Sequence, residues 1–275
     1  MNNAERIANL KPEQYQALFV VKKETFDRML EILEGDYQKK HRQGGRPPKL
    51  SVLDKLIIML EYYKEYRVME CIAFDYGVRK STVCDAIHWV EETLIKSGQF
   101  SLPSKRELWR NPELEAILLD ATESEIERPK KKQRQYYSGK KKRHTMKTQI
   151  IADKKSLDII CVFCGSGKTH DFQLYKNSKT HMSGKIESLQ DKGYQGLQKL
   201  HANSTIPVKA SKNHPLTEEE KKLNREISKR RIYIEHINCY IKRFRILSYR
   251  YRNKRKRFGL RVSLICGIYN FQHAS

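Results

Sequence analysis

Apolar side chains in the first hundred residues recur three or four positions apart, the spacing of one helix face. The clearest run starts at Val52. A shorter helix is predicted over 68–77, where a glycine stops it, and a longer one over Lys80–Lys96, with Ser81 or Thr82 near its start as a cap. A short helix, a turn containing glycine and a longer helix form the pattern of a helix-turn-helix.

The second helix of such a motif reaches into the DNA major groove with its first residues. Here those positions carry cationic and hydroxyl side chains. An ordinary three-helix bundle with no DNA role would show the same spacing, so both interpretations stay open. The candidate DNA-binding residues are Arg79, Lys80, Ser81 and Thr82.

From about residue 115 the pattern changes to short apolar or alternating runs rich in Ile, Val and Thr, which are typical of strands. A long helix is predicted from 217 to about 247, and a closing helix over 258–271. Strands with flanking helices indicate an α/β layered domain. We therefore predict a helical lead-in over 1–45, a helix-turn-helix region over 46–100 and an α/β domain over 110–275. The predicted strands cover 115–124, 146–154, 157–165, 185–194 and 204–211.

The charge changes the picture, because the formal net charge is +23. Such a balance favours a polyanionic partner, with nucleic acid ahead of an anionic membrane surface. Two dense basic runs, 130–147 and 242–261, have tyrosines between the cations. One such run alone would be read as a solvated surface, whereas two favour binding to a phosphate backbone.

Several other classes of protein are disfavoured. No stretch approaches the roughly 18 consecutive apolar residues of a membrane span, and the N-terminus lacks the apolar core of a signal peptide. Six cysteines in 275 residues do not form a disulfide framework. The Gly-Lys-Thr at 167–169 lacks the earlier glycine of a phosphate-binding loop, since Val162 occupies that position. We expect a cytoplasmic, nucleoid-associated protein with no membrane partner and no nucleotide cofactor.

Three carboxylates occupy positions from which they could act together. Asp120 ends an apolar strand, Asp191 follows another, and Glu235 lies in the long helix. Carboxylates at the ends of core strands are held rigidly at the edge where ligands bind in α/β proteins. Each alone has an ordinary interpretation as a turn, a cap or a solvent-facing residue, so the prediction rests on their combination.

The helix that carries Glu235 has a distinct polar face. At about 100° per residue, Ser228, Arg231, Glu235 and Lys242 fall within an arc of roughly 60°. A carboxylate flanked by two cations suits a phosphodiester, since the cations can contact phosphate oxygens. A simple helical ion pair between Arg231 and Glu235 is the alternative. A separate apolar stripe is predicted to be buried and consists of Ile227, Ile234, Ile237, Ile241 and Phe244.

This helix resembles the signature of a group of bacterial insertion-sequence transposases of the DDE type: Tyr, two residues, Arg, three residues, Glu, six residues, Lys. Arg231, Glu235 and Lys242 match, and Ser228 replaces the tyrosine. The segments LLDATE at Asp120 and LQDKGYQG at Asp191 resemble two further blocks of the family. So do KKKRHTMKTQ, with His144 and Lys147, and His170-Asp171. The resemblance covers the chain from about residue 45 to its end.

The resemblance implies a ribonuclease-H-like mixed sheet with flanking helices over 110–275. Asp120, Asp191 and Glu235 would hold two Mg²⁺ (or Mn²⁺) ions about 4 Å apart. Arg231, Lys242 and Lys147 would contact DNA. The partners would be the terminal inverted repeats of the element and target DNA, with a homodimer assembled on them. Two alternatives stay open: a catalytically inactive, domesticated DNA-binding protein, and a structure-selective nuclease that cuts without joining.

Overall fold

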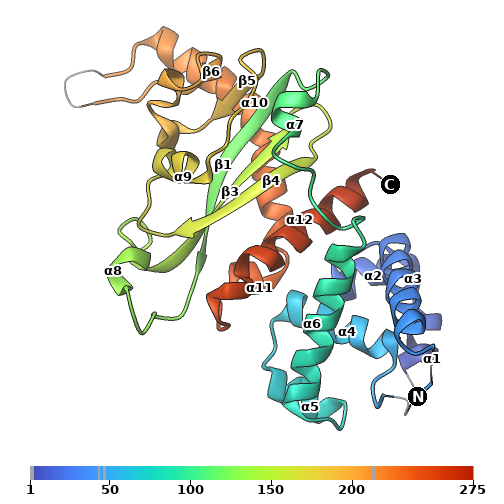
Figure 1. Ribbon diagram of the computed structural model, residues 1–275. Coiled ribbons are helices and arrows are strands. Elements are labelled where there is room, and N and C mark those ends of the chain that lie inside the picture. Colours follow the sequence, from blue (N-terminus) through green and yellow to red (C-terminus); the bar gives the residue numbers. More distant parts are fainter. Residues whose placement is uncertain (1–2, 43, 46–47, 212–214, 275) are drawn as a thin grey trace. The chain divides into compact units, whose positions relative to one another are not determined.

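The computed structural model describes residues 3–42, 44–45, 48–211 and 215–274 (Figure 1). The chain forms two compact units. Unit 1 consists of Met1–Ser101, Ile241–Tyr249 and Ser263–Ser275, and unit 2 consists of Leu102–Tyr240 and Arg250–Val262. The loop expected between the lead-in and the helix-turn-helix includes residues 43, 46 and 47, which lie outside the described residues. The three-part division therefore stays a prediction.

Unit 1 is helical. Its helix-turn-helix consists of α5 and α6, and α6 begins and ends where the sequence predicts. In the turn between them, Gly77 has a φ of +59°, a left-handed conformation that glycine adopts without steric strain. The predicted cap is wrong: α6 begins one residue before Ser81, so Arg79 is its N-cap. The helices of this unit are α1 (Asn3–Ala8), α2 (Pro12–Phe19), α3 (Lys23–Lys40), α4 (Val52–Glu65), α5 (Met69–Asp75), α6 (Lys80–Lys96), α11 (Arg245–Ser248) and most of α12 (Phe258–Ala274).

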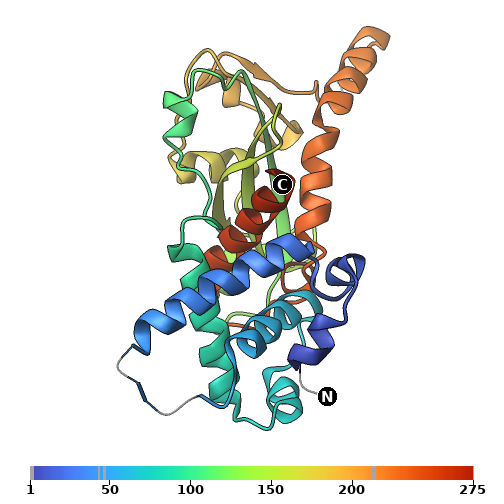
Figure 2. The same cartoon turned by 90° about the vertical axis from the view of Figure 1, so that its right-hand side faces the viewer.

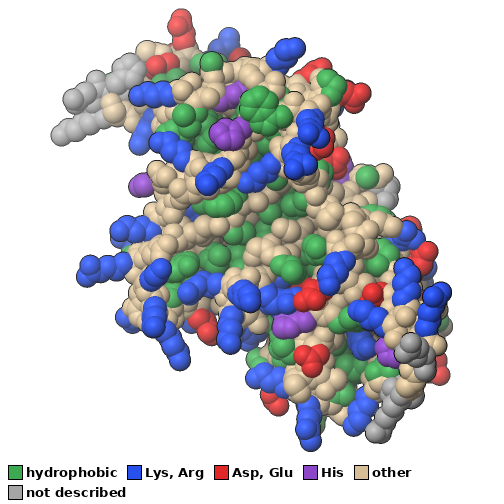
Figure 3. Space-filling view, viewed as in Figure 1, with side chains coloured by type: hydrophobic (Ala, Val, Ile, Leu, Met, Phe, Trp, Pro, Cys, Tyr) green, Lys and Arg blue, Asp and Glu red, His purple; other side chains and the backbone are tan. Residues whose placement is uncertain are grey.

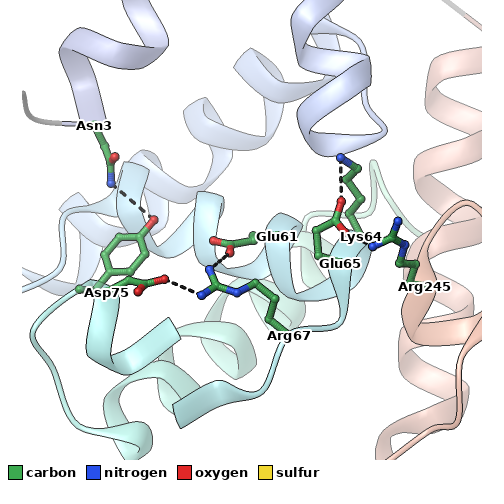
Figure 4. Close-up of polar contacts among 8 residues, drawn as sticks. Asn3, Glu61, Lys64, Glu65, Arg67, Asp75 and Arg245 are labelled. Carbon is green, nitrogen blue, oxygen red and sulfur yellow. Dashed lines mark hydrogen bonds and ion pairs between the residues drawn. The ribbon is translucent and has the colours of Figure 1, made fainter. Parts of the chain in front are cut away.

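An arginine between α4 and α5 fixes the first helix of this motif (Figure 4). Arg67 donates to Glu61 of α4 and, at 2.7 Å, to Asp75 at the end of α5. The hydrogen bonds that it donates to both carboxylates raise the pKa of Arg67 above its usual value, so the guanidinium stays charged. In the same unit Arg245 of α11 pairs with Glu65.

The end of α12 completes unit 1. The backbone N–H of Lys22 donates to Oε1 of Gln272 at 2.6 Å, and its Nζ donates to the Gln272 carbonyl at 2.9 Å. Gly267 lets the Phe100 backbone approach, since a Cβ there would lie 2.0 Å from the Phe100 carbonyl oxygen. The last helix is therefore part of the unit that contains the helix-turn-helix.

Unit 2 is built on a mixed sheet. β1 pairs antiparallel with β3 and parallel with β5. The strand order is β4-β3-β1-β5-β6, and the short β2 extends β3 at one end. Figure 2 shows α10 on one face of the sheet and α7 and α9 on the other. The elements are α7 (Glu107–Arg110), β1 (Ala116–Glu125), α8 (Gln133–Tyr136), β2 (Tyr137–Ser138), β3 (Arg143–Asp153), β4 (Ile159–Ser166), α9 (Asp171–Ser178), β5 (Glu187–Gln190), β6 (Ser204–Thr205), α10 (Glu218–Ile241), and the 3-10 turns η1 (Lys192–Tyr194), η2 (Leu197–Lys199) and η3 (Arg255–Arg257).

The core of unit 2 follows the alternation of β1. Ile117 and Leu119 point into a cluster that includes Tyr175 of α9 and Tyr194, so Leu118 and Asp120 face the opposite side, toward α10. The predicted fold class is thus confirmed: a helix-turn-helix region precedes a mixed sheet with flanking helices. Among the described residues, no helix is both long and apolar enough to span a bilayer.

Three predicted elements are shorter than expected. The strand predicted over 185–194 contains only Glu187–Gln190, because Lys192–Tyr194 forms the 3-10 turn η1 that Asp191 caps. The last strand contains only Ser204 and Thr205, because Pro207 has no N–H to continue a ladder. The long helix ends at Ile241 rather than near 247, because the chain turns there to bury the Phe244 ring, which lies 6.5 Å from the ring of Tyr63. The predicted apolar stripe is confirmed, since all five of its members are buried.

Candidate active site

Asp120 lies in β1, with its side chain directed at α10. Its Oδ2 accepts a hydrogen bond from Nδ2 of Asn238 at 2.7 Å, and its Oδ1 lies 3.6 Å from Nη2 of Arg231. The pKa of Asp120 is raised to about 6, chiefly by burial; the charge of Arg231 opposes this rise, whereas the charges of Asp191 and Asp171 contribute to it. The carboxylate is therefore held between one cation and two anions.

Asp191 follows β5, the parallel neighbour of β1. Its Oδ1 accepts a hydrogen bond from the Gly193 N–H at 2.8 Å, which caps the turn η1. Leu119 pairs with Gln190 across the two strands. Asp120 and Asp191 each come one residue after this pair, so they lie side by side where β5 ends against the middle of β1. Contrary to the expectation from the sequence, Asp120 does not end its strand, because β1 continues to Glu125.

Asp171, the first residue of α9, lies beside this pair. Its Oδ1 accepts from Nζ of Lys147 at 2.7 Å, and the same ammonium lies 3.8 Å from Glu123. A Cβ on Gly193 would lie 2.4 Å from Oδ2 of Asp171 and 3.0 Å from Oδ1 of Asp191. The two aspartates therefore line one narrow space that only glycine leaves open. Lys147, expected to contact DNA, is largely buried in this ion pair.

Part of the polar face of α10 lies against Asp120, through Arg231 and Asn238. By helical spacing, Glu235 lies on the same side of α10 as Arg231 and Asn238. It is exposed and has no hydrogen bond or ion pair to any residue that the structure describes. The alternative ion pair between Arg231 and Glu235 does not form. Arg231 pairs with Asp120 instead. Lys242 follows the last residue of α10, so helical spacing no longer places it on this face.

The oxygen-rich arrangement fits a hard divalent cation. Within the described residues, no three His, Cys, Asp or Glu side chains are already arranged to hold a metal. The neighbouring carboxylates repel one another, and a bound cation would remove that repulsion. Three buried atoms around Asp120 also have no partner in the described chain: Oη of Tyr194, Nε of Arg231 and Oδ1 of Asn238. Buried polar atoms are normally hydrogen-bonded, and a hydrated cation with its phosphate substrate would supply partners here.

The two basic runs meet in unit 2. Glu125, at the end of β1, accepts 2.8 Å hydrogen bonds from Arg143 and from Arg250, 107 residues later in the chain. The guanidinium of Arg255 lies 4.4 Å from the centroid of the Tyr136 ring. We call the resulting surface the basic face, and Figure 3 shows Lys and Arg gathered there, around α8. Its exposed members are Lys130, Lys131, Lys132, Arg134, Lys140, Lys141, Lys142, Arg143, Arg250, Arg252, Lys254 and Lys256.

The start of α6 is accessible. Arg79, Lys80 and Ser81 are exposed, and Thr82 is half-buried. Lys80 lies 3.8 Å from Glu70 of α5, and both side chains are largely exposed. These residues are placed where a helix-turn-helix contacts DNA.

Two residues of the site were not singled out from the sequence. Asn238 follows Arg231 by seven positions, so helical spacing could have placed it within about 20° of the arginine. Asp171 gave a weaker signal, as half of a familiar His-Asp pair, because its position beside Asp191 depends on how α9 packs and on the space at Gly193.

Two family models and one curated protein match this chain. A family model described as "DDE superfamily endonuclease" matches residues 119–270, and one described as "Helix-turn-helix of DDE superfamily endonuclease" matches 48–100. The chain is 42% identical over 271 residues, 98% of each chain, to a protein of Microchaete diplosiphon named as a probable transposase for insertion sequence element IS702. No solved structure matches. The chain therefore belongs to the family of DDE superfamily endonucleases that carry a helix-turn-helix ahead of the endonuclease domain.

Proposed function

We propose that this protein is a transposase that cuts and joins DNA strands at the ends of an insertion sequence. The observation that carries the proposal is that Asp120 and Asp191 occupy adjacent positions on neighbouring strands, with Asp120 against the polar face of α10. Membership of the endonuclease family and the full-length similarity to a probable transposase support it.

Asp120, Asp191 and Glu235 would hold Mg²⁺ or Mn²⁺, as two ions. Such ions activate the attacking oxygen and stabilise the leaving oxygen of a phosphodiester. Arg231 stabilises the Asp120 carboxylate when no cation is bound. Its guanidinium also lies where it can donate to a phosphate oxygen of the substrate. Asn238 fixes the direction of the Asp120 carboxylate through its 2.7 Å hydrogen bond.

Two surfaces would share the DNA. The start of α6 would read base edges in the terminal repeats, which gives sequence specificity. The basic face would hold the phosphate backbone without regard to sequence. It lies at the end of β1 that follows Asp120, so a duplex bound there extends from the catalytic end of the sheet.

These two roles predict different losses of DNA binding. Replacing Arg79 and Ser81 with Ala should lower the preference for terminal-repeat DNA over random DNA by about tenfold or more. Replacing Lys140, Lys141 and Lys142 with Gln should weaken binding to both DNAs alike. It should also reduce the slope of log affinity against log salt by up to about 2.7, since each phosphate contact contributes about 0.9.

A matched control comes from the opposite end of the sheet. Lys154 and Lys155 follow the last residue of β3, and Lys185 lies just before the first residue of β5. Replacing these three with Gln removes the same charge and should leave the salt slope within experimental error of the wild type. Equal losses in the two triple variants would show that net charge alone, and not the basic face, sets the affinity.

The function itself is tested with purified protein, a plasmid carrying the sequences that flank the gene, and a target plasmid. With Mg²⁺ or Mn²⁺ we expect cleavage at the repeats and joining of the 3′ ends to the target. Cleavage without joining would instead identify a nuclease. Specific binding with no cleavage in either ion would identify an inactive, domesticated protein. We expect two copies on paired ends, and the mass of the protein–DNA complex in solution measures this.

A further inference from the structure

The carboxylate of Asp171 is directed at the same space as that of Asp191. One point beside Gly193 lies 2.4 Å from Oδ2 of Asp171 and 3.0 Å from Oδ1 of Asp191. The two oxygens belong to different elements, α9 and the turn after β5, so their approach is produced by the fold. Two carboxylates that border the same point repel each other, and a cation between them would remove that repulsion.

A buried hydroxyl lies near these aspartates. The Tyr194 side chain is fully buried, and its Oη has no hydrogen-bond partner in the described chain. Burial raises the pKa of Tyr194 well above its usual value, and the charges of Asp171, Asp120 and Asp191 each raise it further. The hydroxyl is therefore within electrostatic reach of all three aspartates. It is a donor that could bind a ligand oxygen or a metal-bound water.

The cation nearest to Asp171 in the chain is Lys147, held between two acids. Its ammonium donates to Oδ1 of Asp171 at 2.7 Å and lies 3.8 Å from Glu123, and both contacts are largely shielded from solvent. This contact occupies one oxygen of Asp171 and leaves Oδ2 directed at the space beside Gly193. Lys147 thus orients the carboxylate without covering the oxygen that faces Asp191.

We propose that Asp171 is an additional ligand of the divalent cation site, shared with Asp191 and Asp120, and that Lys147 is the positioning residue that orients it. The inference rests on the proposed function, because it adds a fourth acid to the metal site assigned there. It assigns one cation to the space between Asp171 and Asp191, on the rigid side of the site. The exposed Glu235 would join from α10 when DNA is present.

Mn²⁺ binding to the full chain without DNA, followed by electron paramagnetic resonance, tests the proposal independently of activity. Asp171→Asn should weaken the affinity for Mn²⁺ by at least about tenfold. Asp158→Asn, a neutralised acid in the β3–β4 turn, is the matched control and should bind as the wild type does. Wild-type affinity in Asp171→Asn would overturn the proposal.

The variant Lys147→Gln distinguishes two roles of Asp171: a ligand of the metal, or one half of an ion pair that only stabilises the fold. If Asp171 is a ligand, the Gln variant keeps Mn²⁺ affinity within a few-fold, because the carboxylate remains. If the ion pair only holds the fold, Lys147→Gln and Asp171→Asn lose binding equally, together with their circular dichroism signal, and the proposal fails. Should the single Asn variant not fold, the double variant Lys147→Gln/Asp171→Asn leaves no unpaired buried ammonium and should still show the loss.

The failure of this inference can be told apart from failure of the proposed function. Asp120→Asn should also lose Mn²⁺ affinity. Loss in Asp120→Asn with wild-type affinity in Asp171→Asn overturns only the role of Asp171. Loss in Asp171→Asn with wild-type affinity in Asp120→Asn supports that role and removes Asp120 from the metal site.

Discussion

Replacing Asp120 with Asn should reduce strand cleavage by at least about a thousandfold, and the metal-free protein should be no less stable than the wild type at neutral pH. The loss follows because a metal-bound oxygen contributes several kcal/mol to the transition state, and about 1.4 kcal/mol corresponds to a factor of ten. Stability is retained because the wild-type chain buries a carboxylate near two like charges, and Asn removes that repulsion while keeping a partner for Asn238.

The burial of Asp120 also predicts in which direction the free energy of unfolding changes with pH. The pKa of Asp120 is about 6 in the folded chain and about 3.9 in an unfolded one. The folded state therefore binds this proton more tightly. The stabilising contribution is complete below about pH 4 and is lost as the pH rises through about 6. In chelator, this group should lower wild-type stability by up to about 3 kcal/mol across that window, and the Asn variant should lack this component.

Thermal unfolding from pH 4 to pH 8 in chelator, together with cleavage of terminal-repeat DNA in Mg²⁺, measures both parts. Asp158→Asn serves as the control for removing one acid from unit 2. An Asp120→Asn protein that cuts at the wild-type rate would exclude Asp120 from the chemistry. A variant that unfolds far more readily than the wild type would show a structural role instead.

Gly193→Ala should lower both metal affinity and cleavage by about a hundredfold or more. The added methyl group would lie 2.4 Å from Oδ2 of Asp171 and 3.0 Å from Oδ1 of Asp191, so one or both carboxylates must move. A displacement of about 1 Å at a catalytic centre is enough for a loss of that size. The φ of Gly193 is not in the left-handed region, so the backbone itself accepts alanine and the effect comes from crowding at the carboxylates.

Gly184→Ala is the control for this variant, since a Cβ there meets nothing within 4 Å. It should fold, bind Mn²⁺ and cut DNA as the wild type does. Mn²⁺ titration and cleavage rates for the two alanine variants make the comparison. Wild-type behaviour of Gly193→Ala would mean that neither aspartate at this point needs its present position for catalysis.

The sequence was most informative where local pattern determines structure. Helical spacing predicted α6 to the residue and all five buried positions of the apolar stripe, four of which lie in α10, because a periodic apolar face must pack inward. Alternation predicted the strands that carry Asp120 and precede Asp191.

What could not be predicted depends on contacts between distant segments. The approach of Asp171 to Asp191 needs α9 to pack beside the turn after β5, and no local pattern contains that information. The end of α10 at Ile241 follows from burial of the Phe244 ring beside Tyr63. In the same way, the two basic runs come together at Glu125 because a parallel β-bridge joins Ile126 to Tyr251, and these residues are far apart in the sequence.

The hydrogen bonds between Lys22 and Gln272 join two segments of unit 1 that are synthesised far apart in time. The first helices of unit 1 are synthesised before unit 2, yet the residues that complete their core, from Gly267 to Gln272, are synthesised after it. Unit 1 can therefore reach its full stability only after unit 2 has been made. A copy of the gene cut short before these codons would encode a chain whose helix-turn-helix is left without this part of its support. Pulse proteolysis of a chain ending at residue 262, compared with the full chain, measures that difference.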